Sequence, residues 1–152
     1  MPAPLFLGAG RARVRAIEAL RGTIRACPNA PETLAMSRLL VTFDLDNLGT
    51  PREYRPPADR VLEGDIVCRN WDVDSAKDGK VRAGVFESTP GTNRSIKGES
   101  WEFCYILSGV AEITEDGHPP KLFRAGDCFI MKPGYVGTWR SLETVRKVWV
   151  VA

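Results

Sequence analysis

The chain has 152 residues, which is the size of one ordinary domain and is tight for two. Hydrophobic residues make up 43% of it and charged residues 26%, and no apolar run approaches the roughly 18 residues of a membrane-spanning helix. The formal net charge of +2 is too small to indicate nucleic acid as a partner. The single histidine, His118, excludes His-rich metal sites and His acid–base pairs built within one subunit.

Basic residues are concentrated at the start of the chain. Residues 1–40 contain six arginines and two acidic residues, a net charge of +4, whereas residues 41–152 have a net charge of −2. The four cysteines are widely spaced and form no CxxC pair, and a chain of this length does not need a disulfide framework. We therefore expect reduced, buried thiols and a cytoplasmic protein.

Residues 1–36 are rich in Arg and Ala and superficially resemble a transit peptide, but their apolar stretch is too short for a secretory signal. Apolar residues recur in this segment at the spacing of a helix, namely Val14, Ile17, Leu20 and Ile24. Pro28 and Pro31 end any such helix. Three interpretations remain open: a helix packed on the rest of the chain or on a partner subunit, a weakly ordered extension, or a start codon assigned too early, with Met36 as the true first residue.

The rest of the chain, residues 37–152, has the pattern of short strands separated by turns. Strands are predicted over residues 38–43, 65–71, 81–88, 103–107, 110–114, 121–123, 128–131, 137–142 and 146–151. The sequence of residues 77–80, Lys-Asp-Gly-Lys, predicts a hairpin, because Asp-Gly favours the positive φ of a tight turn. Residues 46–60, with three prolines and a glycine, are predicted to be a loop. Turn signals at intervals of about eight to twelve residues predict a β-sandwich or barrel.

Two segments resemble the paired motifs of the cupin family. Residues 102–109, EFCYILSG, are similar to the end of the first motif, in which a Glu precedes a Tyr-Val-Leu-x-Gly turn. Residues 126–134, GDCFIMKPG, are similar to the start of the second, Gly-Asp-x4-Pro-x-Gly. Residues 137–139 and 145–149 resemble a subgroup of small single-domain cupins, that of (S)-ureidoglycine aminohydrolase and the ethanolamine-utilisation cupin. The resemblance covers residues 60–152 and implies an all-β, RmlC-like jelly-roll barrel with a ligand pocket, preceded by the helical extension.

The resemblance also implies where a metal would bind, and this sequence departs from the family pattern there. Metal-binding cupins take two His and a Glu from the first motif and one His from the second, and only Glu102 is present here. The positions of the three histidines fall on Ser95 and Lys97 (or Ile96 and Gly98 with the shorter spacing) and on Gly137. A lone carboxylate does not fill a divalent-metal site, so no metal and no cofactor are expected. The metal-free cupins that act as dTDP-sugar epimerases use a His base, which this chain also lacks.

Five residues are predicted to contact the ligand. Because alternate residues of a strand share a face, Glu102 and Cys104 are expected to point into the barrel together. Burial would raise the pKa of both side chains; alternatively, an internal Lys or Arg neutralises Glu102, and Cys104 belongs to the core. Tyr135 and Trp139 flank the position of the lost second-motif histidine and are predicted to line the pocket. Glu87 lines the pocket or faces solvent, which strand alternation alone does not decide.

Other residues are weaker candidates. Three basic residues are candidates to bind an anionic substrate through charge-assisted hydrogen bonds, namely Arg82, Arg140 and Lys147. Residues of this kind more often lie at the solvated surface. His118 lies in the turn sequence DGHPP and is expected to be an exposed loop residue. The remaining tryptophans are expected in the core or a dimer interface, namely Trp71, Trp101 and Trp149.

These observations leave three functional hypotheses. The first is a binding or sensor protein for a small polar or carboxylate-bearing metabolite. The second is a metal-independent lyase, isomerase or amidohydrolase-like enzyme that uses Glu102 as general acid or base, assisted by Tyr135 or a Lys. The third is a subunit that acts in a larger assembly through residues 1–36. The resemblance and the composition together lead us to expect a bacterial homodimer that binds neither nucleic acid nor membranes.

Overall fold

A computed structural model of the chain describes residues 39–152. The predicted helical extension over residues 1–36 lies outside these residues. The described part contains eleven β-strands, one short 3-10 helix and no α-helix, so the all-β prediction is confirmed for it. No helix in this part of the chain is long and apolar enough to cross a membrane.

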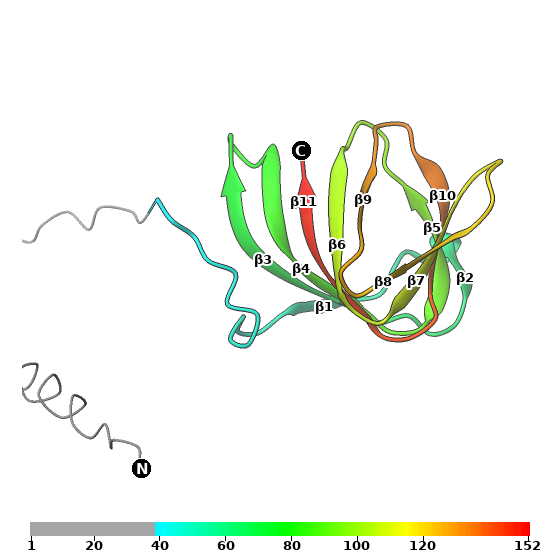
Figure 1. Ribbon diagram of the computed structural model, residues 1–152, viewed down its shortest axis with the longest axis horizontal. Helices are drawn as coiled ribbons and strands as arrows, with labels where there is room; N and C mark the ends of the chain where they lie inside the picture. Colours follow the sequence, from blue (N-terminus) through cyan, green and yellow to red (C-terminus); the bar gives the residue numbers. More distant parts are fainter. Residues whose placement is uncertain (1–38) are drawn as a thin grey trace, which may run out of the picture. The chain divides into compact units, whose positions relative to one another are not determined.

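The strands form two antiparallel sheets, which face each other in Figure 1. Sheet A has the strand order β1-β3-β4-β11-β6-β9, and sheet B has the order β2-β5-β10-β7-β8. The elements are β1 (Arg52–Tyr54), η1 (Ala58–Arg60), β2 (Val61–Glu63), β3 (Cys68–Ala76), β4 (Val81–Ser88), β5 (Gly91–Ile96), β6 (Glu102–Ser108), β7 (Val110–Glu115), β8 (Lys121–Arg124), β9 (Cys128–Met131), β10 (Val136–Ser141) and β11 (Val145–Val151).

The strands predicted from residue 65 onward are confirmed, within a few residues at their ends, but two other predictions are wrong. The segment predicted as a strand over residues 38–43 forms no strand in its described part, because no neighbouring strand pairs with its backbone. Leu39 and Leu40 are accordingly 96% and 80% exposed. The loop predicted over residues 46–60 contains β1 and η1, and the polar strand β5 was not predicted, since its sequence GTNRSI has no apolar alternation.

The core lies between the sheets and is built from the inward-facing residues of the central strands. Burial alternates along β6 and β10, as expected for strands with one face on the core. The buried cluster consists of Cys104, Ile106, Ala111, Ile113, Met131, Trp139 and Val145. Burying a large apolar side chain contributes about 1.5–3 kcal/mol, so this cluster is a main source of stability for the sandwich.

The pairing of β11 with its two neighbours decides which side chains enter the core. Lys147 is opposite Phe86 on β4 and Ile106 on β6, and Trp149 is opposite Gly84 and Cys104. Since paired residues of an antiparallel sheet point to the same face, Lys147 faces the interior with its apolar neighbours. A register irregularity between β11 and β6 lies at Arg146 and Lys147, directly beside this lysine.

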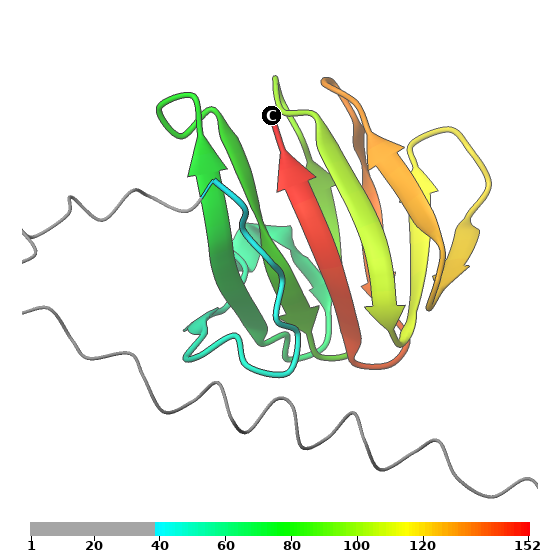
Figure 2. The ribbon, with the colours of Figure 1, turned by 60° about the vertical axis from the view of Figure 1, so that its left-hand side comes forward.

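A segment before β1 covers part of the outer face of sheet A. The Arg146 guanidinium donates a hydrogen bond of 2.9 Å to the carbonyl oxygen of Leu45, and the Trp71 indole donates one of 3.0 Å to that of Gly49. The guanidinium also lies 5.5 Å from the centre of the Trp71 ring. Figure 2 shows this segment, in cyan, passing in front of sheet A.

The predicted hairpin between β3 and β4 is confirmed. Lys77, Asp78 and Gly79 have φ values of 52°, 55° and 79°, and the amide of Lys80 donates a 3.1 Å hydrogen bond to the carbonyl of Lys77. An added Cβ at Gly79 would meet no atom within 4 Å, so this glycine is required only by its backbone conformation.

We expect Gly79→Ala to lower the free energy of unfolding by about 1 kcal/mol, because an L-residue is strained at this positive φ. Urea denaturation of both proteins measures the difference. Lys80→Ala, in the same turn but without a positive φ, is the matched control and should change stability by less than about 0.5 kcal/mol. Equal effects of the two substitutions would show that the turn adapts and that glycine is not required there.

Candidate ligand-binding site

A buried carboxylate with two lysine partners lies between the sheets. Glu102, the first residue of β6, is only 8% exposed. The Lys97 ammonium, just after β5, donates a hydrogen bond to one carboxylate oxygen, Oε2. The Lys147 ammonium, on β11, donates a hydrogen bond of 2.7 Å to the other, Oε1. Both carboxylate oxygens are therefore engaged, and the three charges together amount to +1.

Lys147 is buried and has four partners. Its Nζ lies 3.2 Å from the Cys104 Sγ, in addition to its bond with Glu102. It also lies 4.5 Å from the centre of the Trp139 ring and 5.2 Å from that of Phe86. Aromatic faces attract cations, so these rings compensate part of the hydration that the ammonium loses on burial.

The two lysines reverse the effect of burial on the Glu102 carboxyl. Burial alone would raise its pKa, but the charges and hydrogen bonds of Lys147 and Lys97 lower the pKa to about 2. Burial would likewise lower the pKa of Lys147, but its attraction to Cys104 and Glu102 and its hydrogen bonds to them raise it above the ordinary value. The prediction of a raised pKa for Glu102 is therefore wrong, and the alternative of an internal Lys partner is correct.

Cys104 is fully buried beside this ion pair, with its Sγ 3.4 Å from Glu102 Oε1. Burial, opposed by the charge of Lys147 and assisted by that of Glu102, raises the pKa of Cys104 to about 11. The thiol is therefore neutral at physiological pH, and the expected inert character agrees with this shift, since the thiolate is the nucleophilic form. At this pH it is Glu102 that carries the negative charge facing Lys147.

A cavity of about 260 Å³ adjoins the ion cluster. Its walls combine aromatic rings, small polar groups and cations, among them Tyr54, Phe86, Trp139, Ser88, Asn93, Ser95, Arg60, Lys97 and Lys147. Arg94 also borders it, but its guanidinium forms hydrogen bonds of 2.9 and 2.7 Å with Asp116. Among the described residues that line this cavity, none is an Asp or a Glu.

The sequence from residue 75 to residue 149 matches the profile of the EutQ-like cupin domain. These residues form a EutQ-like cupin domain. The resemblance predicted from the sequence is thus confirmed, and the two antiparallel sheets are those of the cupin fold.

Solved structures support the cupin fold. A protein of unknown function from Pseudomonas syringae pv. tomato str. DC3000, assigned to the DUF861 family, is similar with a TM-score of 0.61 and 22% identity, over 68% of this chain and 43% of that chain. A predicted oxalate decarboxylase from Thermotoga maritima has a TM-score of 0.55 and 16% identity, over 67% of this chain and 90% of that chain. A putative ethanolamine utilization protein Q from Salmonella typhimurium LT2 has a TM-score of 0.50 and 17% identity, over 64% of this chain and 76% of that chain.

These likenesses establish the fold and not an activity, since all three identities are below 25%. The chain spans less than half the length of the Pseudomonas protein. A search of curated proteins found no significant match.

The residues at the metal-binding positions of the cupin domain do not fit a metal ion. Protonated Lys97 and Lys147 have no free electron pair to donate, and their ammonium groups already occupy both oxygens of Glu102. Ser95, at another of these positions, has its Oγ 3.9 Å from the Met131 sulfur. Within residues 39–152, no three His, Cys, Asp or Glu side chains converge on one point.

Gly137 stands where the second cupin motif would supply a histidine. It is paired with Ser95 on β5, so the sheet does bring these two positions together. An added Cβ at Gly137 would lie 2.1 Å from the carbonyl oxygen of Thr114 and 2.5 Å from the Tyr135 hydroxyl. No side chain fits at this position unless the neighbouring strand β7 moves.

The structure brings three of the five predicted ligand-contacting residues together. Glu102 and Cys104 form the buried cluster, and Trp139 lines the adjoining cavity. Tyr135, just before β10, lines a second, more apolar cavity to which β7, β8 and β9 contribute, and its hydroxyl donates a 3.2 Å hydrogen bond to the Thr114 carbonyl. Glu87 lies outside the cluster and forms a 2.9 Å ion pair with Arg69.

The weaker candidates lie elsewhere, except for Lys147. Arg140 lies 3.7 Å from Glu112 in an exposed ion pair, and the Arg82 guanidinium lies 5.9 Å from the centre of the Trp149 ring. His118 is in the exposed loop between β7 and β8, as predicted.

Sequence analysis missed the parts of the site that come from β1 and β5. Tyr54, Asn93 and the role of Lys97 depend on elements without a clear periodic signal. The inward position of Phe86 had a usable signal, because it alternates with Ser88 along β4.

We expect Lys147→Met to lower the free energy of unfolding by about 3 kcal/mol, because it removes one partner of a buried carboxylate. The double variant Glu102→Gln/Lys147→Met should recover most of this loss, since the neutral amide needs no ammonium partner and Lys97, left without the carboxylate, is the more exposed of the two lysines. Urea denaturation at neutral pH measures both. Arg140→Gln breaks an exposed ion pair and should cost less than about 1 kcal/mol. If the effects of the two substitutions on the free energy of unfolding simply added in the double variant, the coupling of these two residues would be contradicted.

The lowered pKa of Glu102 predicts a loss of stability in acid. Because the folded-state pKa of about 2 is below the ordinary 4.5, the carboxylate stabilises the folded protein above about pH 4.5, and this contribution is lost as the pH falls toward 2. Over this pH interval, the free energy of unfolding of the wild-type protein should fall by roughly 3 kcal/mol more than that of Glu102→Gln. Urea denaturation at several pH values measures it, and parallel curves for the two proteins would contradict the ionised carboxylate.

Proposed function

We propose that the cavity beside Glu102 binds a small carboxylate-bearing metabolite. The observation that carries this proposal is the charge of the cavity wall, to which Arg60, Lys97 and Lys147 contribute and no acidic side chain does. Hydrogen bonds between an ammonium or guanidinium group and a carboxylate are the strong ones in proteins. An anion entering this cavity therefore meets favourable partners and no repelling charge on its wall.

Lys97 is the residue that we assign to the ligand carboxylate. Its side chain is 17% exposed and comes from the end of β5, whereas that of Lys147 is 8% exposed and surrounded by partners. The remaining walls suit the apolar part of a small metabolite, because the rings of Tyr54, Phe86 and Trp139 border the cavity. Apolar walls with a few placed polar groups are typical of small-molecule sites.

A catalytic role for Glu102 is less well supported than binding. A carboxyl with a pKa of about 2 is ionised at neutral pH, so it has no proton to give as a general acid. It is also a weak general base, since an efficient one has a pKa near the working pH. Tyr135, proposed as its assistant, lines a different cavity.

The test compares carboxylates with their neutral amides: acetate, malonate, succinate and benzoate against acetamide, malonamide, succinamide and benzamide. We expect at least one carboxylate to raise the melting temperature and to bind in calorimetry at least about tenfold more tightly than its amide. Lys97→Gln should weaken that binding by about tenfold or more. Equal effects of acid and amide, or no carboxylate bound at all, would contradict the proposal.

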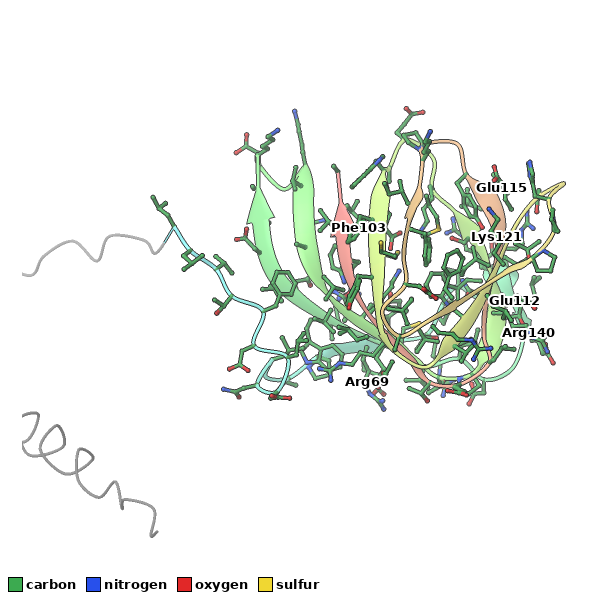
Figure 3. All side chains as sticks on the ribbon, in the orientation of Figure 1. Arg69, Phe103, Glu112, Glu115, Lys121 and Arg140 are labelled. Carbon is green, nitrogen blue, oxygen red and sulfur yellow. The ribbon has the colours of Figure 1, made fainter. Side chains whose placement is uncertain are left out.

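Lys121→Gln is the matched control, since it removes a lysine charge on β8, none of whose residues lines this cavity. Figure 3 labels Lys121. This variant should leave the affinity unchanged. Because the side-chain amide introduced by Lys97→Gln can still donate to Glu102, this variant is expected to fold, and urea denaturation checks it. An equal loss in both variants would indicate only a general effect of net charge.

A further inference from the structure

A second cavity lies where the two sheets end next to each other. Within the described residues, β8 pairs only with β7 and β9 only with β6, so no backbone hydrogen bonds close the sandwich between β8 and β9. We call the space lined by residues of β7, β8, β9 and the two adjoining loops the edge cavity. Its volume of about 410 Å³ is typical of small-molecule sites, which measure about 300–1,000 Å³. A single turn of helix, about 10 Å across and about 5.4 Å long, would already fill about 420 Å³, so the edge cavity suits a small molecule better than a helix.

The inner walls of the edge cavity are aromatic and apolar. Phe123 of β8, Phe129 of β9 and Tyr135 supply three rings, and the ring centres of the two phenylalanines are 4.2 Å apart. The buried side chains of Ile113 and Met131 complete these walls. Aromatic rings pair favourably with one another in offset or edge-to-face arrangements. A flat ring is therefore the best-matched group to enter between these walls.

The wall formed by Tyr135 depends on Gly137. An added Cβ at Gly137 would lie 2.5 Å from the Tyr135 hydroxyl oxygen and 2.9 Å from its Cζ atom, so the tyrosine ring lies over the glycine backbone. The hydrogen bond from the Tyr135 hydroxyl to the Thr114 carbonyl fixes the ring there. The position at which the second cupin motif would supply a histidine thus supports an aromatic wall of the edge cavity instead.

The rim of the edge cavity carries two opposite charges. Glu115 on β7 and Lys121 on β8 both line it, and both are exposed; Figure 3 labels them. Lys121 is opposite Ile113, so Glu115, two residues further along β7, is its diagonal neighbour, at a typical distance of about 7–8 Å. Within residues 39–152, no ion pair joins these two residues. Glu115 lies only 3.9 Å from a ring nitrogen of His118, so both charged groups are available to a ligand between them.

We infer that the edge cavity binds an aromatic α-amino acid. Its ring lies between the walls of Phe123, Phe129 and Tyr135, its ammonium group pairs with Glu115, and its carboxylate pairs with Lys121. A ligand that is only an anion meets repulsion from Glu115, and one that is only a cation meets repulsion from Lys121. A ligand with both charges on one carbon atom complements both rim residues, through the charge-assisted hydrogen bonds that are strongest in proteins.

The edge cavity is distinct from the cavity beside Glu102. Among the described residues, none lines both cavities. The walls of the first cavity carry cations and no acidic side chain, whereas the rim of the edge cavity carries one acidic residue and one lysine. The inference therefore does not rest on the proposed carboxylate site, and either one can fail while the other holds.

The test measures binding to the full chain by calorimetry with three indole compounds: L-tryptophan, 3-indolepropionate, which lacks the ammonium group, and tryptamine, which lacks the carboxylate. We expect L-tryptophan to bind at least about tenfold more tightly than either analogue, because each analogue loses one charge-assisted contact and retains one repulsion. Glycine, which has both charges and no ring, should show no binding up to about 10 mM.

Substitutions at the rim assign each charge to its partner. Glu115→Gln should weaken the binding of L-tryptophan by about tenfold and that of tryptamine similarly, with no loss for 3-indolepropionate. Lys121→Gln should weaken L-tryptophan and 3-indolepropionate, with no loss for tryptamine. Glu112→Gln, on β7 but in an exposed ion pair with Arg140, is the matched control for the first variant. Lys80→Gln, in the hairpin between β3 and β4, is the matched control for the second.

Three results would overturn the inference. The absence of binding of L-tryptophan at millimolar concentration would show that the edge cavity is not a site for aromatic amino acids. Equal binding of all three indole compounds would show that the rim charges do not recognise the ligand. A loss of L-tryptophan binding in Lys97→Gln, without a loss in Glu115→Gln and Lys121→Gln, would place the ligand in the cavity beside Glu102.

Discussion

The architecture of the interior depends on neutralising one carboxylate. An unpaired buried Glu102 would cost several kcal/mol, and its two lysine partners come from different sheets: Lys97 from the end of β5 and Lys147 from β11. The ion cluster therefore forms only when both sheets are assembled. A one-residue slip of β11 would turn Lys147 to the outer face, so the cluster also selects the register of that strand.

In the ion cluster, two ammonium groups rather than a coordinated metal ion neutralise the Glu102 carboxylate. A divalent ion and a pair of ammonium groups both neutralise a carboxylate, but ammonium groups offer hydrogen bonds to an anion and no vacant coordination position. Two of the other histidine positions are occupied by Ser95, beside Met131, and by Gly137, which has no room for a side chain. The cupin domain thus keeps an electropositive centre whose chemistry suits anion binding.

The sequence alone was sufficient to predict the strands in which apolar and polar residues alternate strongly and the turns that contain Asp-Gly. It failed at the strand predicted over residues 38–43, whose described residues have no strand to pair with, and at the polar strand β5. The inward position of Glu102 followed from alternation, but the direction of its pKa shift did not. That shift depends on Lys147, 45 residues away, which reaches Glu102 only through the pairing of β6 and β11.

The two lysines are not equivalent, and the difference explains how such a cavity can accept an anion. Lys147 is held by Glu102, Cys104 and two aromatic rings and is the more buried of the two lysines. Lys97 shares Glu102 from the more exposed side. If a ligand carboxylate draws Lys97 away, Lys147 still neutralises Glu102, and Lys97 neutralises the ligand. Binding then leaves no buried charge without a partner, which is the condition under which an internal anion site is stable.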